Sequence, residues 1–298
     1  MSEYRFNPFD GRVVIVASHR AGRPINFHGK SPFVPENEGL TPPTTLALPS
    51  PQDWKVRCFN NAFPALERKG KYAPRKKELG WRSAAFGDHE VIVETPSQAE
   101  QYEDFDEDQR MLVFEAYVNR TEALYNRPGI EYVSLFKNHG PKAGASIGHE
   151  HSQILALPFI PQEAQRRMDA YGKGLYAKAI KAEAKNAVKK TKRFTLIRPS
   201  FAIHPYELWL YPNKPASRLA DFDAAAAGEF MACLCDAVRR VKRVAQDYNL
   251  LFHQSPPGKR RFFYAQLIPR TNTWAGLEFE SGVIINSKTV KDAVTALR

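Results

Sequence analysis

Residues 132–158 read YVSLFKNHGPKAGASIGHEHSQILALP, two β-strand patterns separated by a glycine-rich loop. About 116 residues further along, the chain repeats this order with YNLLFHQ, a loop and FYAQLIPR. In both copies these strands follow a strand that ends in proline, EVIVETP or YELWLYP, then an Asp-Phe-Asp turn and a helix pattern. A unit that occurs twice in this way predicts a duplicated fold.

Each repeat contains one helix pattern, which starts at an aspartate suited to capping a helix N-terminus, Asp106 or Asp223. Apolar residues then recur at three- and four-residue steps, so one face of each helix should cover a sheet. The stripes comprise Met111, Phe114 and Val118 in the first helix and Phe230, Leu234, Ala237 and Val241 in the second. Short strands joined by hairpin-like loops favour an antiparallel sheet.

These patterns predict an α+β architecture that is built twice. Residues 1–170 are expected to form an N-terminal half, which contains the closely spaced histidines of the segment quoted above. Residues 171–298 are expected to form a C-terminal half, which lacks these histidines. Residues 160–195 should connect the halves as a helical, basic segment.

The composition is that of an ordinary globular protein, with 298 residues and 43% hydrophobic content. No run of about eighteen uncharged apolar residues occurs, and the first residues, MSEYRFNPFDGR, lack the apolar stretch of a secretory signal. We therefore expect a cytoplasmic protein with no membrane partner. Cys58, Cys233 and Cys235 offer neither a disulfide framework nor metal-ligand spacing, so they are interpreted as small core residues.

The formal net charge of +11 favours anionic partners, which could be phosphorylated small molecules or nucleic acid. Much of the excess lies between Lys178 and Arg193, where the sequence reads as an exposed basic helix. A solvated helix face is the favoured interpretation of this segment. A nucleic-acid patch is the alternative.

The densest functional signal lies between Asn138 and Gln153. The period of two in a strand places His149, His151 and Gln153 on one face, so three side chains that carry nitrogen or oxygen should converge there. The intervening residues, Glu150, Ser152 and Ile154, should point to the opposite face.

Anion-binding features precede these histidines in the chain. Three glycines let backbone N–H groups approach an anion, and Ser146 adds a hydroxyl group. The glycines are Gly140, Gly144 and Gly148. In the segment SHRAGRP, Arg20 and Arg23 lie three residues apart in a turn, so both guanidinium groups could point toward one phosphate. Arginines exposed only to solvent are the alternative.

A histidine suits nucleophilic attack on phosphorus, because neutral imidazole attacks near pH 7 and later leaves as a stable cation. Phosphoryl transfer needs little else beyond positioning and positive charge. Two histidines on a strand can instead be packed core residues with satisfied ring nitrogens. The glycine loop ahead of His151 and the glutamine behind it favour the catalytic interpretation.

Together these residues resemble the galactose-1-phosphate uridylyltransferase family, within the histidine-triad superfamily. The resemblance covers nearly the whole chain, from RFNPFDGRVVIVASHRAGRP through FNNAFPALE, VIVETP, FKNHGPKAGASIGHEHSQI and PYELWLYP to IPRTNTWAGLEFESGVIIN. It implies a duplicated histidine-triad-like fold, in which an antiparallel sheet forms a half-barrel with covering helices. It also implies a homodimer.

The resemblance assigns His151 as the nucleophile that carries the nucleotide, with Gln153 and Ser146 beside its phosphate. The substrate-binding residues that it implies are Arg20, Arg23, Phe33, Phe59, Asn61, Asn138, Gly144, His149 and Glu278. Among them the two phenylalanines should wall the base pocket, and Asn61 should contact the nucleoside. Glu278 should reach the sugar from the neighbouring subunit.

The mechanism that the resemblance implies is ping-pong. His151 would attack the α-phosphorus of a nucleoside diphosphate sugar and expel sugar 1-phosphate, and a second sugar 1-phosphate would reverse the step. Gln153 cannot shuttle a proton, so transfer to a phosphate acceptor is favoured over transfer to water. The expected partners are a nucleoside diphosphate sugar and a sugar 1-phosphate, and no nucleic acid is expected. UDP-glucose and galactose 1-phosphate are the expected pair. The alternatives are an ADP-sugar or dinucleoside polyphosphate phosphorylase, or a non-catalytic protein that binds nucleotides or RNA.

Two departures from the family pattern concern metals. Many members have a Cys-x-x-Cys zinc site, but Ser31 and Val34 occupy those positions here, which leaves only His149 of four ligands. At a second, iron-type site only His253 remains. We therefore expect no bound metal and no other cofactor.

A third departure lies between the two histidines, where Glu150 replaces the proline that is common in the family. Its side chain should point away from the reacting face. We therefore expect it to affect strand rigidity or to pair with a basic residue.

Overall fold

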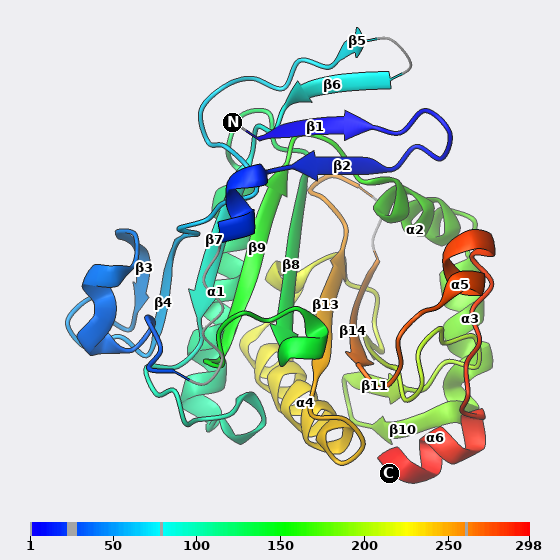
Figure 1. Cartoon of the computed structure of the whole chain (residues 1–298). Helices are drawn as coiled ribbons and strands as arrows, with labels where there is room; N and C mark the ends of the chain where they lie inside the picture. The colour runs from blue at the N-terminus through cyan, green and yellow to red at the C-terminus, as the bar shows by residue number, and fades with distance from the viewer. Residues whose placement is uncertain (1, 23–28, 78–79, 260–261) are drawn as a thin grey trace.

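The computed structural model describes residues 2–22, 29–77, 80–259 and 262–298. A ten-stranded antiparallel sheet forms the centre of the molecule, with the strand order β10-β11-β12-β14-β13-β8-β9-β7-β4-β3 (Figure 1). Its strands are β3 Thr44–Leu48, β4 Val56–Asn60, β7 Asp88–Val93, β8 Tyr132–His139, β9 His151–Leu157, β10 Ala187–Lys190, β11 Phe194–Ile197, β12 Leu208–Pro212, β13 Tyr248–Gln254 and β14 Phe263–Pro269.

The order of the central strands confirms the duplication. The first repeat supplies β7, β9 and β8, and the second supplies β13, β14 and β12. The two copies join where β8 pairs with β13, from His139 opposite Tyr248 to Leu135 opposite Phe252. The sheet is therefore continuous through both repeats, and the boundary expected at residue 170 stays a prediction.

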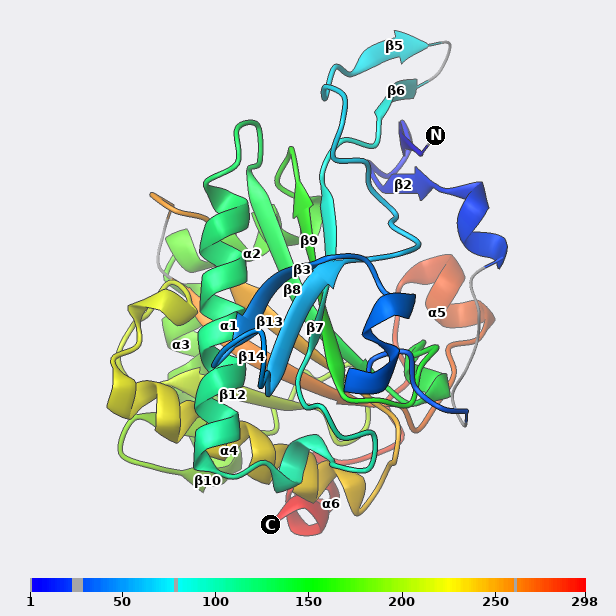
Figure 2. The ribbon, with the colours of Figure 1, turned by 90° about the vertical axis from the view of Figure 1, so that its left-hand side faces the viewer.

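Two long helices follow the predicted pattern, α1 Glu107–Tyr125 and α4 Ala224–Lys242. Asp106 caps α1 by accepting a hydrogen bond from the amide of Gln109, and Asp223 caps α4 by accepting one from the amide of Ala226. Their apolar faces belong to one core with the central strands. Figure 2 shows α1 on one side of this sheet and the short helix α5, Gly276–Ser281, on the other.

A smaller four-stranded sheet of order β2-β1-β6-β5 lies beyond one end of the main sheet (Figure 1). Its strands are β1 Glu3–Phe6, β2 Val13–Val16, β5 Arg75–Lys77 and β6 Gly80–Ala84. The remaining helices are α2 Gln162–Gly172, α3 Leu175–Glu183 and α6 Val290–Leu297. No helix in the described ranges is long and apolar enough to cross a membrane, and the cytoplasmic location stays a prediction.

The prediction of one basic helix up to Arg193 is wrong beyond residue 183. After α3 the chain forms β10, which pairs with β11 at the edge of the main sheet and buries Val188. Two of the basic side chains are ion-paired with α4, since Lys189 lies 3.2 Å from Asp236 and Arg193 lies 2.9 Å from Glu229. Sheet pairing and these ion pairs override the local helix propensity.

Candidate active site

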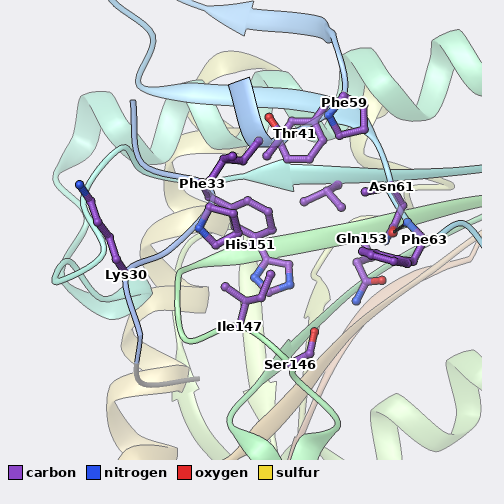
Figure 3. Close-up of a pocket in the computed structure, with 15 residues that line it drawn as sticks. Lys30, Phe33, Thr41, Phe59, Asn61, Phe63, Ser146, Ile147, His151 and Gln153 are labelled. Carbon is purple, nitrogen blue, oxygen red and sulfur yellow. Dashed lines mark hydrogen bonds between the residues drawn. The ribbon is translucent and has the colours of Figure 1, made fainter. Parts of the chain in front are cut away.

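A cavity of about 390 Å³ opens on the face of the sheet opposite α1 (Figure 3). His151 and Gln153 from β9 lie at its base, as the alternation of the strand predicted. Ser152 and Ile154 point to the other face, where Ser152 hydrogen-bonds Glu94 and Ile154 joins the core. The strand register therefore brings the two central site residues into one cavity.

The ring of His151 is oriented by its own backbone. Its Nδ1 lies 2.6 Å from the carbonyl oxygen of His149, so the proton sits on Nδ1 and is donated to that oxygen. Burial lowers the pKa of His151 to about 4, which leaves the ring neutral near pH 7. The Nε2 lone pair is then available toward the cavity, and the ring of Phe33 packs beside it at 5.3 Å.

Gln153 is oriented by a residue that the sequence did not identify, His89 of β7. The amide of Ala65 donates to Nδ1 of His89, so the ring proton must lie on Nε2. That Nε2 lies 2.9 Å from Oε1 of Gln153, and it donates its proton there. The oxygen end of the glutamine is therefore held, and its NH2 group is left to donate to a ligand.

Apolar side chains form most of the cavity wall. Phe33 and Phe59 are both buried, with ring centroids 5.7 Å apart, and Leu40, Val91 and Ile147 complete the slot. This arrangement agrees with the expected wall of a base pocket. The assignment of a base to this wall stays a prediction.

Asn61 lies at the opposite end of the cavity from Phe33 (Figure 3). Its Oδ1 accepts a 2.8 Å hydrogen bond from the amide of Phe63, which fixes the side chain. Its Nδ2 lies 3.2 Å from Nε2 of His89; because both nitrogens carry hydrogen, this is a contact and not a hydrogen bond, and it places Asn61 beside the oriented glutamine. Asn61 can therefore contact a ligand that reaches from the apolar slot to Gln153.

The glycine loop between β8 and β9 is anchored from β13 and the turn before it. Gly140 has a φ of 86°, and a Cβ there would overlap the carboxylate of Asp247. That carboxylate accepts a 2.8 Å hydrogen bond from the amide of Lys142. Ser146 lines the cavity below His151 (Figure 3), whereas Gly144 lies exposed on the loop.

Asn138 does not line this cavity. It lies on the other side of the glycine loop, in a smaller hollow of about 130 Å³ that it shares with His149. Its Oδ1 accepts a 2.8 Å hydrogen bond from Nδ2 of Asn249, so its own NH2 group remains to donate. Any contact of Asn138 with a phosphate therefore has to come from that side of the loop.

His149 also lies outside the main cavity, so the expected convergence of three side chains holds only for His151 and Gln153. β9 begins at His151, and the chain before it does not keep the strand alternation. Nδ1 of His149 lies 2.9 Å from Oγ of Ser31, and Nε2 lies 2.7 Å from the carbonyl oxygen of Thr95. Both ring nitrogens thus have protein partners, and Ser31 is held further by Gln98 at 2.9 Å.

No group of three or more potential metal ligands occurs within the described ranges. The hydrogen bonds of His149 occupy the lone pair that a metal would need. The absence of metal in the protein itself stays a prediction.

The remaining expected residues lie at the margin or elsewhere. Arg20 donates to the carbonyl oxygen of Phe63, a wall residue, and Arg23 lies outside the described residues. Glu278 is on α5, where it accepts hydrogen bonds from the amides of Ala275 and Ile285. It does not line the cavity of its own chain, so a role in the site requires another copy.

The second repeat has a counterpart of this site that is closed. Gln266 lies between Trp209 and Leu251, as Gln153 lies between Val91 and Phe136 in the first repeat. Both ends of the Gln266 amide are occupied, by His253 and Glu207, each at 2.7 Å. Tyr264 takes the place of His151 and stacks on Trp209 at 4.5 Å. Among the described residues, the position of the second repeat that corresponds to His151 therefore holds a stacked tyrosine and no imidazole.

The site combines a neutral nucleophilic nitrogen, an oriented amide donor and an apolar slot. Together these features suit the transfer of a group on phosphorus that carries a flat ring. A family model described as galactose-1-phosphate uridyl transferase, N-terminal domain, matches residues 1–161. The chain therefore belongs to the galactose-1-phosphate uridylyltransferase family of nucleotidyltransferases.

Relatives of two kinds match most of the chain. An ADP-glucose phosphorylase from Arabidopsis thaliana is 28% identical over 99% of this chain and 92% of its own length. A galactose-1-phosphate uridylyltransferase from Thermotoga maritima is also 28% identical, over 89% of this chain and 81% of its own length. The crystal structure of an ADP-glucose phosphorylase from A. thaliana with bound ADP-glucose has a TM-score of 0.81 and 26% identity, covering 100% of this chain and 98% of that one.

Proposed function

We propose that this protein moves a nucleoside monophosphate from a nucleoside diphosphate sugar to a phosphate-bearing acceptor, through a covalent bond to His151. The observation that carries the proposal is a largely buried, neutral imidazole that lines a cavity of about 390 Å³ beside an oriented amide. A ligand cavity of this size fits a nucleotide.

In the first step Nε2 of His151 attacks the α-phosphorus, and the bond from that phosphorus to the bridging oxygen breaks. Sugar 1-phosphate leaves with the electron pair of that bond. The ring becomes cationic, and its Nδ1–H remains donated to the carbonyl oxygen of His149, which stabilises the charge. In the second step an acceptor phosphate oxygen attacks the same phosphorus, and the imidazole leaves as the neutral base.

Gln153 assists both steps without moving a proton. Because His89 holds its oxygen, its NH2 group faces the non-bridging oxygens of the phosphate and stabilises their growing charge. Phosphate acceptors are already ionised near pH 7, so no general base is required. Water would need one, so transfer to phosphate is the favoured reaction.

The end of the cavity near Phe33 and Phe59 favours adenine over uracil as the base of the nucleotide. The hydroxyl of Thr41 donates its one proton to the carbonyl oxygen of Glu38 at 2.8 Å and accepts from Arg57, so it has no proton left to donate to a carbonyl oxygen of uracil. An apolar slot bounded by Phe33 and Phe59 gains more from stacking with the larger purine ring.

ADP-glucose with inorganic phosphate as acceptor is therefore the first donor and acceptor pair that we propose. The extended match to the Arabidopsis ADP-glucose phosphorylase supports it. Uridylyl transfer between UDP-glucose and galactose 1-phosphate is the second candidate, which the family model and the Thermotoga relative support.

A homodimer in which Glu278 reaches the partner's site is part of the proposal. α5 and the residues after it include four apolar side chains that are between 46% and 71% exposed. They are Leu277, Phe279, Val283 and Ile285. An exposed apolar patch around a polar residue is typical of a protein interface.

The mass of the intact protein after exposure to a donor tests the covalent step. We expect ADP-glucose to add the mass of AMP to the wild-type chain and nothing to His151→Gly, and phosphate to remove the label as ADP. Labelling by UDP-glucose, discharged by galactose 1-phosphate, would select the second candidate. Salt-sensitive binding of RNA with no label from either donor would instead support a non-catalytic binding protein.

A further inference from the structure

A cluster of buried charges lies directly behind His151, on the α1 side of the sheet. Lys137 of β8 is 1% exposed, and its Nζ lies 2.5 Å from Oε2 of Glu94. The same Nζ forms an ion pair with Glu150. Both carboxylates are buried, so Lys137 is enclosed by two acids in the core. Glu150 therefore pairs with a basic residue, which is one of the two roles predicted for it from the sequence.

The cluster is connected to the backbone on both sides of the nucleophile. Nζ of Lys137 lies 3.3 Å from the carbonyl oxygen of His151 and donates to it. The amide of Glu94 donates to the carbonyl oxygen of Glu150 at 3.1 Å. The carbonyl oxygen of His149 in turn accepts the Nδ1 proton of His151. All three successive carbonyl groups, from 149 to 151, therefore have a defined partner.

The second carboxylate oxygen of Glu150 also lies next to a basic side chain. Nδ1 of His139 lies 3.0 Å from Oε1 of Glu150, and the imidazole stacks on the ring of Tyr248 at 4.8 Å. Tyr117 and Ser152 hydrogen-bond the other oxygen of Glu94. The side chains of Glu150 and Glu94 are therefore fixed in position.

Stability alone does not account for such a cluster. Burying three charged groups costs a large desolvation energy, and apolar residues of similar volume often stabilise a core equally well. A rigid polar network can instead select one geometry. The geometry selected here is that of the segment that aims His151 into the cavity.

We propose that Glu150, held by Lys137 and Glu94, is a positioning residue that fixes the backbone of His151 for attack on phosphorus. This inference rests on the proposed function, in which His151 is the nucleophile. The proline common at this position in the family limits the backbone through its ring. Glu150 limits the same backbone through ionic contacts beneath the sheet.

Three substitutions at position 150 test the inference. Glu150→Ala and Glu150→Gln remove the charge but leave Lys137 paired with Glu94, so the core keeps one balanced ion pair. Glu150→Pro removes the same charge and restores rigidity by the ring. No hydrogen bond found in the described part of the chain uses the amide of Glu150, so proline removes none.

The matched control is Glu90→Gln. Like Glu150, Glu90 of β7 is buried on the α1 side of the sheet. It pairs with Arg120 of α1 at 2.8 Å. It lies opposite Ile154 and does not touch the segment from 149 to 151. Loss of this ion pair should lower Tm without changing the orientation of the His151 side chain.

The measurements are the single-turnover rate of labelling by ADP-glucose and UDP-glucose and the Kd of AMP and UMP. We expect Glu150→Ala and Glu150→Gln to label about tenfold to a hundredfold more slowly, because small misplacement of a nucleophile costs that much. The Kd should stay within about twofold. Glu150→Pro should label much faster than either, and Glu90→Gln should label at the wild-type rate.

Two results would overturn the inference while leaving the proposed function in place. One is a Glu150→Ala protein that labels at the wild-type rate, and the other is a Glu150→Pro protein as slow as Glu150→Ala. A variant that fails to fold is replaced in this comparison by Glu150→Gln, which keeps the side-chain shape. A wild-type protein that takes no label from either donor would overturn the proposed function itself and this inference with it.

Discussion

Nε2 of His89 lies 2.9 Å from Oε1 of Gln153, across the pairing of β7 with β9. The amide of Ala65 fixes the tautomer of the imidazole, so the ring donates and the glutamine oxygen accepts. In the proposed reaction, this contact turns the NH2 end of the glutamine toward the substrate phosphate. His89 would then act on the reaction through Gln153.

Replacement of His89 by leucine should slow labelling of His151 by about tenfold to a hundredfold, because the amide can then turn its oxygen toward the phosphate. The Kd of the nucleoside monophosphate should change little, so the effect should appear in the rate at which His151 is labelled. The matched control is His253→Leu, which breaks the equivalent 2.7 Å contact with Gln266 in the closed second site. Equal rates for the wild type and His89→Leu would contradict the role of His89.

The pH dependence of labelling should reflect the low pKa of His151. Burial lowers that pKa to about 4 from its ordinary value of 6.5, so the ring is neutral and nucleophilic at any pH well above 4. The single-turnover rate should be constant from neutral pH down to about one unit above the pKa and should fall below it. An acid limb centred near 6.5 would show that the ring titrates as if exposed.

The same burial should make the fold sensitive to acid. The pKa values of His204 and His253 are lowered to about 4 and about 3, in both cases chiefly by burial. A histidine with a lowered pKa in the folded state binds its proton first in the unfolded state, so stability present above pH 6.5 is lost as the pH falls toward 4. Urea unfolding measured from pH 7 to pH 4 should show a steady fall in the midpoint, and a constant midpoint would contradict this.

His149 should be a structural residue that needs no metal. Its ring bridges Ser31 and Thr95, so His149→Ala leaves the hydroxyl proton of Ser31 without an acceptor and the carbonyl oxygen of Thr95 without this donor. The free energy of unfolding should fall by about 2–4 kcal/mol. A chelator should leave the Tm of the wild type unchanged, and elemental analysis should find no stoichiometric zinc or iron. One tightly bound zinc per chain would contradict the hydrogen-bonded arrangement.

The proposed homodimer predicts complementation between two inactive chains. His151→Gly lacks the nucleophile and Glu278→Ala lacks the residue expected from the partner, yet a mixed dimer contains one site with both. Random reassortment should restore about a quarter of the wild-type activity. Light scattering should give twice the mass of one chain, and Phe279→Asp should shift it toward the monomer. No recovery from mixed dimers of confirmed composition would exclude a shared site.

Much of the fold was contained in local sequence patterns. The repeat, the caps Asp106 and Asp223 and the apolar stripe of α4 depend on neighbours close in the chain, so composition and period could predict them. In α1 only Phe114 of the predicted stripe is buried, whereas Met111 and Val118 are partly buried. The placement of His151 and Gln153 on one face also follows from strand alternation. The helix prediction for the basic segment was wrong after Glu183, because β10 pairs there with β11. Local helix propensity carries no information about pairing between separate strands.

By itself the sequence determined the duplicated architecture and the two residues of β9 that face the cavity, since both follow from short periodic patterns. Only the tertiary structure decided that His89 orients Gln153, that His149 binds Ser31 instead of joining the cavity, and that Lys137 lies between Glu94 and Glu150. The physical reason is that these contacts depend on strand register and on where the regular strand begins. Both are set when distant segments pack together.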